Sequence, residues 1–404
     1  MRIGVITYYK VMNFGATLQA VSTYCYLKNN GYEPVFINYQ SLEAQNAIKK
    51  GKDDPQWKTQ LDFVNGIIKS QTLVCETSSQ LIDIIYKENI AALIIGSDAL
   101  LQHHPFLARI RKGRRRPIYI QNVASDRLFP NIFWGIGINT VIPTALMSVS
   151  SQNSEYKLFS PFTKRKMKGT LSKMKYISVR DTWTRDMVEN VSGISVPVTP
   201  DPVFSFNQNV GNLVPSKSDT IKKFGLSENY ILLSLFEQVV SQEQIREIKK
   251  LFNEDGKELV ILPMPTGGTY EFVADKEIKF PLSPMDWYAL IKYSSGYIGS
   301  NMHPIVVCLH NVVPCFSLDI WGRTNFFNRK VDDGSSKVKH IMSVFGITPN
   351  HRFINNGRCE IEPDEIFDAI KKFPYEQVKI KSSEYLEAYN VMMQDMLNSL
   401  QSYK

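Results

Sequence analysis

The sequence lacks the features that define several protein classes. Its five cysteines (Cys25, Cys75, Cys308, Cys315 and Cys359) include no CxxC pair, so neither a zinc knuckle nor a disulfide framework is indicated. No window reaches the roughly 18 apolar residues that a membrane-spanning helix needs, and the amino terminus has no secretory signal pattern. Internal repeats and low-complexity tracts are also missing. We therefore expect a cytoplasmic protein that is neither exported nor inserted in a membrane.

Length and charge set broad limits on what the chain can be. Its 404 residues, at roughly 150 per domain, predict two or three domains. The 43% hydrophobic and 21% charged residues are typical of soluble globular chains and exclude wholesale disorder. The 47 Lys and Arg residues outnumber the 39 Asp and Glu residues. This net charge of +8 favours anionic partners without distinguishing phosphates, nucleic acid and lipid headgroups.

Short apolar runs alternate with amphipathic stretches of helical length, which predicts an α/β fold with largely parallel sheets. The first set has predicted strands at residues 2–7, 34–37, 92–95, 145–149 and 176–179, and helices at 16–30 and 184–191. The second set has strands at 230–235, 258–262, 296–299 and 314–318, helices at 242–252, 284–293 and 302–311, and a final helix at 379–402. A predicted loop at 207–218 separates the two sets. We expect two Rossmann-like lobes facing across a cleft, residues 1–212 and 213–404, with the C-terminal helix belonging to the second.

Polar residues that follow the predicted strands are candidates for a functional site, because ligands of parallel α/β sheets collect at the carboxyl ends of strands. Asn13 and Gly15 follow the first strand, where Gly permits close backbone approach to a phosphate or sugar. A tight turn without a ligand explains these two residues equally well. Asp98 follows the strand at 92–95 and is a candidate general base, although capping of a helix is the commoner role for such a residue.

Two further strand ends carry polar groups of this kind. Ser151 belongs to a cluster of hydroxyls and amides that suits a sugar or an anion, or simply a solvated loop. Arg180 ends a strand, where its guanidinium is placed for a two-point contact with a carboxylate or phosphate. A structural ion pair of Arg180 with Asp181 or Asp201 is an equally good explanation.

A histidine stands where the strand at 296–299 gives way to a helix. In a cleft, His303 can donate a proton near neutral pH, but a lone histidine more often serves in packing or capping. A metal pair with His310, seven residues further on, is disfavoured because no carboxylate accompanies it. The sequence therefore signals no metal site.

The segment from Arg109 to Arg116 carries six cationic residues in eight positions. A solvated charged loop is the commonest meaning of such a run, and an anionic membrane face or a diphosphate is the next candidate partner. Neither interleaved aromatic residues nor a helix-turn-helix pattern supports recognition of nucleic acid. We expect no nucleic-acid partner.

Four motifs in order along residues 1–330 resemble those of the polysaccharide pyruvyl transferase family. They are GVIT at 4–7 with NFGATLQA at 13–20, IIGSD at 94–98, YISVRD at 176–181 with DP at 201–202, and IGS at 298–300 followed by His303. No single motif is specific, but their ordered combination is. The resemblance implies a two-lobed fold similar to the GT-B glycosyltransferases, phosphoenolpyruvate as donor and a saccharide hydroxyl pair as acceptor. The product would be a pyruvate ketal in bacterial surface polysaccharide.

The resemblance also assigns residues to this chemistry, position by position. Arg180 and His303 match family residues that contact phosphoenolpyruvate, and Arg323 falls where some members have Lys or Arg. Asn301 stands where several members carry Arg, so one cation expected at the donor is replaced and Arg323 is the candidate to compensate. In the implied scheme His303 protonates the methylene carbon of the donor, and Asp98 assists the attack of a sugar hydroxyl.

The remaining expectations concern the acceptor and the alternatives. We assign Asn13, Gly15 and Ser151 to the acceptor side, and the scheme requires no cofactor and no metal. Because acceptors of this family are assembled at the inner membrane face, a lipid-diphosphate-linked acceptor and peripheral membrane contact through residues 109–116 fit the resemblance. The alternatives are a nucleotide-sugar glycosyltransferase on the same architecture and a non-enzymatic binding module for acidic polysaccharide or lipid.

Overall fold

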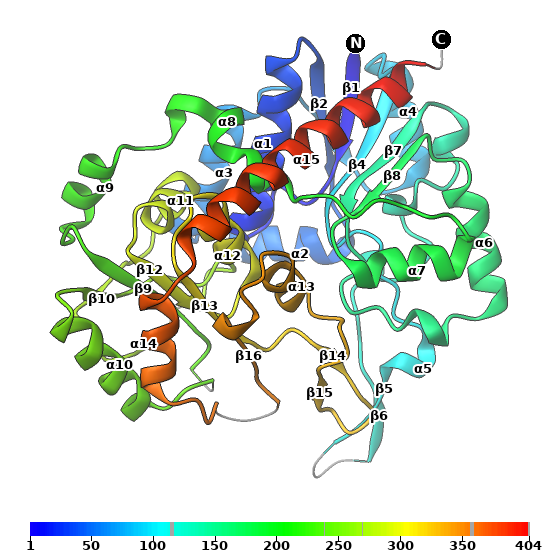
Figure 1. Cartoon of the computed structure of the whole chain (residues 1–404). Helices are drawn as coiled ribbons and strands as arrows, with labels where there is room; N and C mark the ends of the chain where they lie inside the picture. Colours follow the sequence, from blue (N-terminus) through cyan, green and yellow to red (C-terminus); the bar gives the residue numbers. More distant parts are fainter. Residues whose placement is uncertain (114–116, 238, 269, 356–358, 403–404) are drawn as a thin grey trace.

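Two parallel β-sheets of six strands each form the core of the protein in the computed structural model, which describes residues 1–113, 117–237, 239–268, 270–355 and 359–402 (Figure 1). The first sheet has the spatial order β3 (Gln71–Cys75), β2 (Glu33–Tyr39), β1 (Arg2–Ile6), β4 (Ala92–Asp98), β7 (Thr144–Val149) and β8 (Tyr176–Val179). The second has the order β11 (Lys276–Glu277), β10 (Glu258–Ile261), β9 (Tyr230–Ser234), β12 (Gly296–Gly299), β13 (Cys315–Asp319) and β16 (His351–Phe353). The two Rossmann-like lobes predicted from the sequence are confirmed.

Helices connect the strands of each sheet. Along the first sheet the chain forms α1 (Phe14–Asn29), α2 (Leu42–Gly51), α3 (Pro55–Ile67), α4 (Ser78–Lys87), α5 (Phe106–Arg109), α6 (Pro161–Leu171) and α7 (Thr182–Ser192). After it come η5 (Pro202–Ser205), α8 (Phe206–Val210), α9 (Lys217–Phe224), α10 (Gln242–Glu254), α11 (Pro284–Lys292), α12 (Met302–His310), α13 (Lys337–Val344), α14 (Pro363–Lys371) and α15 (Tyr375–Gln401). In the part of the chain that the structure describes, none of these helices is long and apolar enough to cross a bilayer.

Capping side chains explain two differences from the sequence-based prediction. The helix predicted at 16–30 begins earlier, at Phe14, because the Asn13 side chain accepts a hydrogen bond from Ala16 N at 3.3 Å. The prediction of a loop at 207–218 was wrong. Part of it is helical, since α8 lies there and Ser216 caps α9 by accepting a hydrogen bond from Asp219 N at 3.1 Å.

The order of the strands determines where a ligand can bind. In both sheets the chain first adds strands on one side and then crosses to the other, between β1 and β4 in the first sheet and between β9 and β12 in the second. Loops diverge at the carboxyl ends of such strand pairs and leave a crevice. Strands β1 and β4 are almost wholly buried, so their end residues are held rigidly at this crevice.

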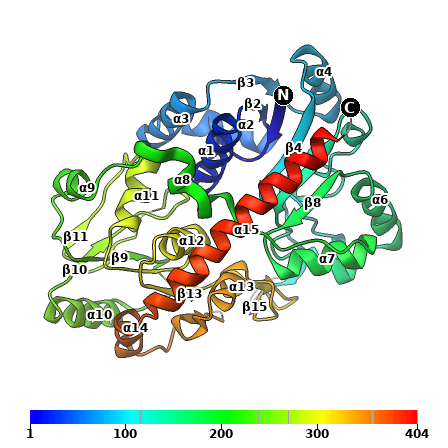
Figure 2. The same cartoon turned by 45° about the horizontal axis from the view of Figure 1, so that its top comes forward.

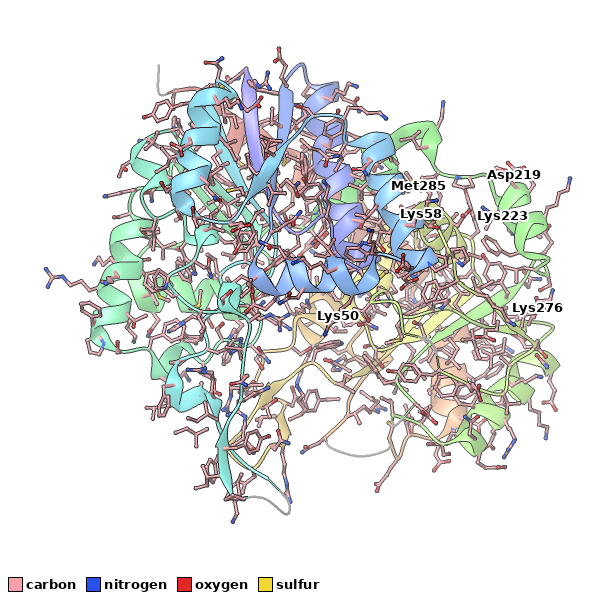
Figure 3. The ribbon with its side chains drawn as sticks, turned by 180° about the vertical axis from the view of Figure 1, so that it is seen from behind. Lys50, Lys58, Asp219, Lys223, Lys276 and Met285 are labelled. Atoms are coloured by element: carbon pink, nitrogen blue, oxygen red, sulfur yellow. The ribbon has the colours of Figure 1, made fainter. Side chains whose placement is uncertain are left out.

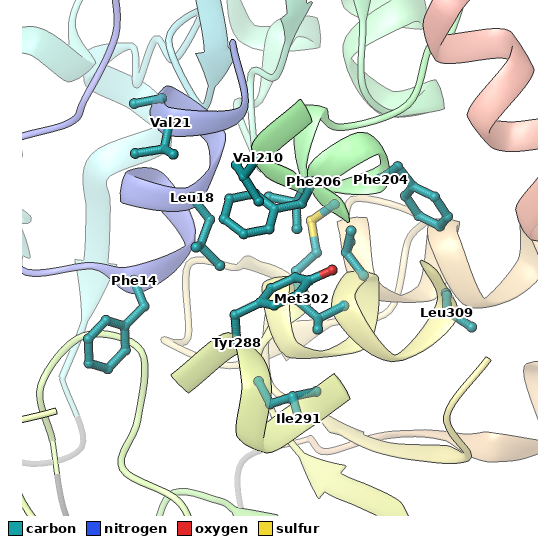
Figure 4. Packing of buried hydrophobic residues seen from close by; sticks show 14 of the residues in the cluster. Phe14, Leu18, Val21, Phe204, Phe206, Val210, Tyr288, Ile291, Met302 and Leu309 are labelled. Atoms are coloured by element: carbon teal, nitrogen blue, oxygen red, sulfur yellow. The ribbon is translucent and has the colours of Figure 1, made fainter. Parts of the chain in front are cut away.

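Apolar contacts between α1, α8, α11 and α12 join the two lobes (Figure 4). Phe14 stacks on Trp287 with ring centroids 5.3 Å apart, and Phe206 packs against Tyr288 at 4.5 Å. Seen from behind, α3 and the start of α11, where Lys58 and Met285 are labelled, also lie close together (Figure 3). There the Gln56 amide donates to Leu282 O at 2.9 Å and accepts from Leu282 N at 2.6 Å.

The C-terminal helix α15 spans both lobes (Figure 2). It is the helix predicted at 379–402, and it begins a turn earlier, at Tyr375. The Ser382 hydroxyl donates to His310 O at 3.3 Å in the second lobe, and Tyr389 meets Tyr26 of α1 edge to face at 5.7 Å. The helix thus ties the second lobe to the first.

Candidate functional site

A cavity of about 610 Å³ lies between the lobes, at the carboxyl ends of strands from both sheets. Its wall includes residues that follow β1, β2, β4, β10, β12 and β13, together with the first residue of α13 (Tyr8, Val11, Met12, Asn13, Ala16, Ser41, Glu43, Ala44, Ala47, Asp98, Ala99, Gln102, Ala124, Asp126, Arg127, Gln152, Pro265, Thr266, Asn301, Met302, His303, Trp321 and Lys337). Four residues predicted from the sequence are in this wall: Asn13, Asp98, Asn301 and His303. The volume suits a small ligand, since such sites occupy roughly 300–1,000 Å³.

A buried charge cluster stands directly behind this wall. The Arg180 guanidinium, 3% exposed at the end of β8, makes an ion pair with Asp201 at 2.7 Å. Its Nη2 lies 4.0 Å from Oδ1 of Asp98, which lines the cavity. The predicted structural ion pair of Arg180 is therefore present, and its partner is Asp201. Asp181 caps α7 by accepting a hydrogen bond from Thr184 N at 2.7 Å.

The surroundings of Asp201 keep this carboxylate ionised. Burial by itself raises the pKa of Asp201, but Arg180, His303 and a hydrogen bond from Val203 N outweigh the effect and lower it. The Gln19 amide also donates to Asp201. Arg180 thus stays charged and in position without any ligand.

The cluster has hydrogen-bonding capacity that the protein leaves unused. Nε and Nη2 of Arg180 and Nε2 of His303 are buried and have no hydrogen-bond partner among the residues that the structure describes. Buried polar groups normally find partners, so each such atom calls for an explanation. An anion with several oxygen atoms would supply acceptors to the two Arg180 nitrogens.

His303 lies in the first turn of α12 and is 7% exposed. Burial lowers its pKa to about 4; Asp201 opposes this shift, and Arg180 and Lys337 add to it, so the free protein holds a neutral imidazole at neutral pH. Nε2 of His303 is 3.8 Å from Asp201 Oδ2. The capping alternative for His303 was wrong, because Asn301 occupies the N-cap position of α12.

Gly15 makes room for the imidazole of His303. A Cβ atom on Gly15 would stand 2.0 Å from Nδ1 of His303, so only glycine fits at this point of α1. The two residues come from different lobes. Gly15 thus packs against the ring of His303 and does not itself line the cavity.

Lys337, the first residue of α13, is a cation of the site that the sequence analysis missed. The pKa of Lys337 is lowered to about 8, mainly by burial and also by the charge of Arg180, although Asp98, Asp181 and Asp201 oppose the shift. Helix α13 was not among the predicted helices, and no motif marked this lysine. Only the assembled fold brings Lys337 to the same cavity as His303.

Asp98 ends β4, and its Oδ1 accepts a hydrogen bond from Ala99 N at 2.6 Å. No helix begins there, so the capping alternative for Asp98 was wrong. Asn13 combines two roles, since it caps α1 and lines the cavity.

Besides Gly15 and Arg180, two further predicted residues lie outside the cavity wall. Ser151 is fully buried and its hydroxyl lies 3.1 Å from the Thr184 hydroxyl, which also rules out a solvated loop there. Arg323 forms ion pairs with Glu155 at 3.0 Å and Asp333 at 2.7 Å. The charge of Arg323 is therefore already balanced by two carboxylates.

A second group of polar side chains lines another part of the cavity. The Tyr8 hydroxyl donates to Asp126 Oδ2 at 2.6 Å, and Arg127 follows in the wall. Glu43 of α2 accepts a hydrogen bond from Ser125 N at 3.1 Å. Hydroxyls and carboxylates in this arrangement suit the hydroxyl groups of a sugar.

The basic segment from Arg109 to Arg116 only partly belongs to the described structure. Residues 114–116 lie outside the described residues. Of the rest, Arg111 is buried, and Lys112 is exposed. At 7% exposure, little of the Arg111 side chain can reach an external partner.

Comparison with known proteins gives one family and one fold. The family model of polysaccharide pyruvyl transferase matches residues 13–322. A search of curated proteins returned no match.

The solved structures that resemble the chain share its two-lobed fold at low identity. UDP-GlcNAc 2-epimerase from Neisseria meningitidis, bound to UDP-GlcNAc, has a TM-score of 0.56 at 10% identity, with 98% of this chain and 100% of that chain covered. UGT73P12 from Glycyrrhiza uralensis has a TM-score of 0.55 at 8% identity, covering 100% and 96%. UDP-GlcNAc 2-epimerase from Methanocaldococcus jannaschii has a TM-score of 0.50 at 10% identity, covering 92% of each chain.

Proposed function

Because this chain belongs to the polysaccharide pyruvyl transferase family, we propose that it moves the pyruvyl group of phosphoenolpyruvate onto two hydroxyls of a saccharide, forming a pyruvate ketal. The observation that carries this proposal is the group of cationic and neutral nitrogen donors at the wall of the cleft and directly behind it. Arg180 and His303 hold unused buried nitrogen atoms there, and Lys337 adds a charge. Phosphoenolpyruvate, with a carboxylate and a phosphate, is an anion of matching chemistry.

Donor binding rests on Arg180 and Lys337 in this proposal. The free Nε and Nη2 of Arg180 donate to one anionic group, and the Lys337 ammonium neutralises part of the other. Asp201 orients Arg180 by the ion pair at 2.7 Å and is a positioning residue. The partly buried setting strengthens each of these contacts relative to water.

His303 acts as the proton donor once the donor substrate is bound. Its pKa of about 4 in the free protein reflects burial and two neighbouring cations. The negative charge of phosphoenolpyruvate offsets those cations and raises the pKa of His303, so that the ring takes up a proton together with the substrate. The proton then goes to the methylene carbon, which becomes a methyl group and leaves the adjoining carbon electrophilic.

Asp98 serves as the base on the acceptor side. It accepts the proton of the first sugar hydroxyl while that oxygen bonds to the electrophilic carbon. The carbon–oxygen bond to phosphate then breaks with its electron pair, and inorganic phosphate leaves. Asp98 passes its proton to the leaving phosphate. The second hydroxyl then adds to the same carbon and gives its proton to the now neutral ring of His303, which closes the ketal ring and restores both residues. Tyr8, Glu43 and Asp126 line the region where the saccharide would lie.

A nucleotide-sugar glycosyltransferase is the second candidate function. The likeness to an epimerase bound to UDP-GlcNAc, with a TM-score of 0.56, supports a fold that accommodates such ligands. The sequence provides no evident pair of residues for a ribose and a base in the second lobe. The two functions differ in donor, which an assay separates directly.

The test is release of inorganic phosphate from phosphoenolpyruvate by the purified protein, with galactose, mannose and N-acetylmannosamine glycosides as acceptors, each with and without a lipid-diphosphate-like anchor. We expect acceptor-dependent release that falls by about two orders of magnitude in Lys337→Gln and His303→Gln. Lys339→Gln is the matched control, because Lys339 lies on the same helix, pairs with Asp332 at 2.7 Å, has a side chain that is 42% exposed and is absent from the cavity wall. Absence of release with every acceptor, combined with thermal stabilisation by a UDP-sugar and none by phosphoenolpyruvate, would support the glycosyltransferase instead.

A further inference from the structure

Two antiparallel hairpins, one from each lobe, project together from the base of the molecule (Figure 1). One consists of β5 (Ile110–Lys112) and β6 (Ile118–Ile120), and the other of β14 (Arg323–Thr324) and β15 (Lys330–Val331). A backbone hydrogen bond from Lys112 N to Phe326 O at 2.8 Å joins them. The two hairpins therefore lie side by side, and we call their exposed side chains, with those of the adjoining α5, the tip surface.

This tip surface carries an unusual share of exposed apolar side chains. It comprises Phe106, Leu107, Ile118, Tyr119, Ile120, Phe326 and Phe327, together with the exposed cations Lys112 and Arg329. These seven apolar residues are among only 18 exposed large hydrophobic residues in the described chain, and Ile118, Leu107 and Phe327 are 60–62% exposed. Exposed apolar side chains gathered at one end of a protein, here on both faces of a hairpin, indicate an interaction site.

The charges of the tip surface indicate what covers it. Residues 104–124 and 325–331 contain no Asp or Glu. Nζ of Lys112 lies 6.0 Å from the ring centroid of Phe327, so cationic and apolar groups are interleaved. A second copy of this surface would meet cation with cation, and aliphatic side chains such as Ile118 and Leu107 provide no stacking face for nucleic-acid bases. Cations beside exposed aromatic and aliphatic side chains fit the boundary between anionic headgroups and acyl chains.

We propose that the tip surface docks the protein on a lipid bilayer that contains anionic headgroups. The apolar side chains enter the headgroup–acyl boundary while Lys112 and Arg329 remain at the level of the anionic headgroups. The cavity is close to this surface along the chain, because Gln102 and Trp321 line the cavity and Phe106 and Phe326 follow within five residues. Five residues span at most about 18 Å. A bilayer at the tip would thus lie near an acceptor bound in the cleft.

Co-sedimentation of the full-length protein with vesicles tests this proposal. We expect binding to vesicles of an equal mixture of phosphatidylcholine and phosphatidylglycerol, and much weaker binding to phosphatidylcholine alone. Phe326→Ser combined with Phe327→Ser should lower the partition coefficient by about tenfold, because buried apolar area is lost. Lys112→Gln combined with Arg329→Gln should lower it by about tenfold or more, and the remaining binding should depend less on salt.

The matched control is Tyr86→Ser combined with Phe162→Ser, since both side chains are 67% exposed at other places on the surface. This variant should bind vesicles like the parent. Failure of the parent to bind the anionic vesicles would overturn the proposal, as would parental binding by the tip variants. A dimer in sedimentation velocity that the tip substitutions dissociate would show that a second copy covers the surface instead. Vesicle binding needs no turnover, so its outcome is independent of whether phosphoenolpyruvate is the donor.

Discussion

Replacement of Gly15 by alanine tests the geometry of the site without removing any of its polar groups. The added Cβ would stand 2.0 Å from Nδ1 and 2.2 Å from Cγ of His303, whereas ordinary van der Waals contact begins at 3.4 Å. The ring must therefore move by more than about 1 Å, which typically costs about 100-fold in rate, or about 2.7 kcal/mol of transition-state stabilisation. Alanine is a better helix former than glycine by up to about 1 kcal/mol, so α1 itself should tolerate the change.

The assay is phosphate release from phosphoenolpyruvate with a productive acceptor, alongside the melting temperature of each variant. Gly169→Ala in α6 is the control, because a Cβ there meets nothing within 4 Å, and we expect parental turnover. In a His303→Ala background, Gly15→Ala should cause no further loss, since the clash requires the imidazole. Parental activity of Gly15→Ala, or losses that simply add in the double variant, would refute the role of the close Gly15–His303 packing.

Three further predictions follow from the buried charges. Arg180→Met should lower the free energy of unfolding, measured by urea titration, by about 3–5 kcal/mol, because it leaves Asp201 buried and unpaired. The double variant Arg180→Met with Asp201→Asn should recover most of this stability but should remain inactive. The pKa of Lys337 is lowered to about 8, so the lysine loses its charge as the pH rises through that value. The KM for phosphoenolpyruvate should therefore increase above about pH 8. Lys337→Arg should remove this increase in KM, because arginine stays charged. Burial lowers the pKa of His310 to about 4, below the value of about 6.5 in an unfolded chain, so the unfolded state binds the proton first and stability falls as the pH drops from about 6.5 towards 4. His310→Leu should reduce that acid loss by up to about 3 kcal/mol, as measured by urea unfolding at neutral and acidic pH.

Much of the fold could be predicted because its signals are local. Each central strand is buried on both faces and reads as a short apolar run, as in β4 and β9, and turn residues mark where the run ends. Strands at the sheet edges gave weaker signals. β3 has only two buried residues and β16 only one, so neither stands out as an apolar run, and both were missed.

The candidate site could be predicted only where a residue follows such a strand. Asn13, Asp98 and His303 were identified for that reason, and all three line the cavity. The pairing of Arg180 remained undecided between Asp181 and Asp201, because an ion pair depends on distances between segments that are separate in the chain.

Apolar periodicity and strand ends are properties of neighbouring residues, so the amino-acid sequence alone was enough to predict two parallel α/β lobes and the sheet edge at which the cavity lies. Contacts between lobes are not encoded in any local pattern. Three features depend on how separate segments pack, which only the tertiary structure decides. They are the placement of Lys337 in the cavity, the packing of Gly15 against His303, and the ion pairs of Arg323 with Glu155 and Asp333.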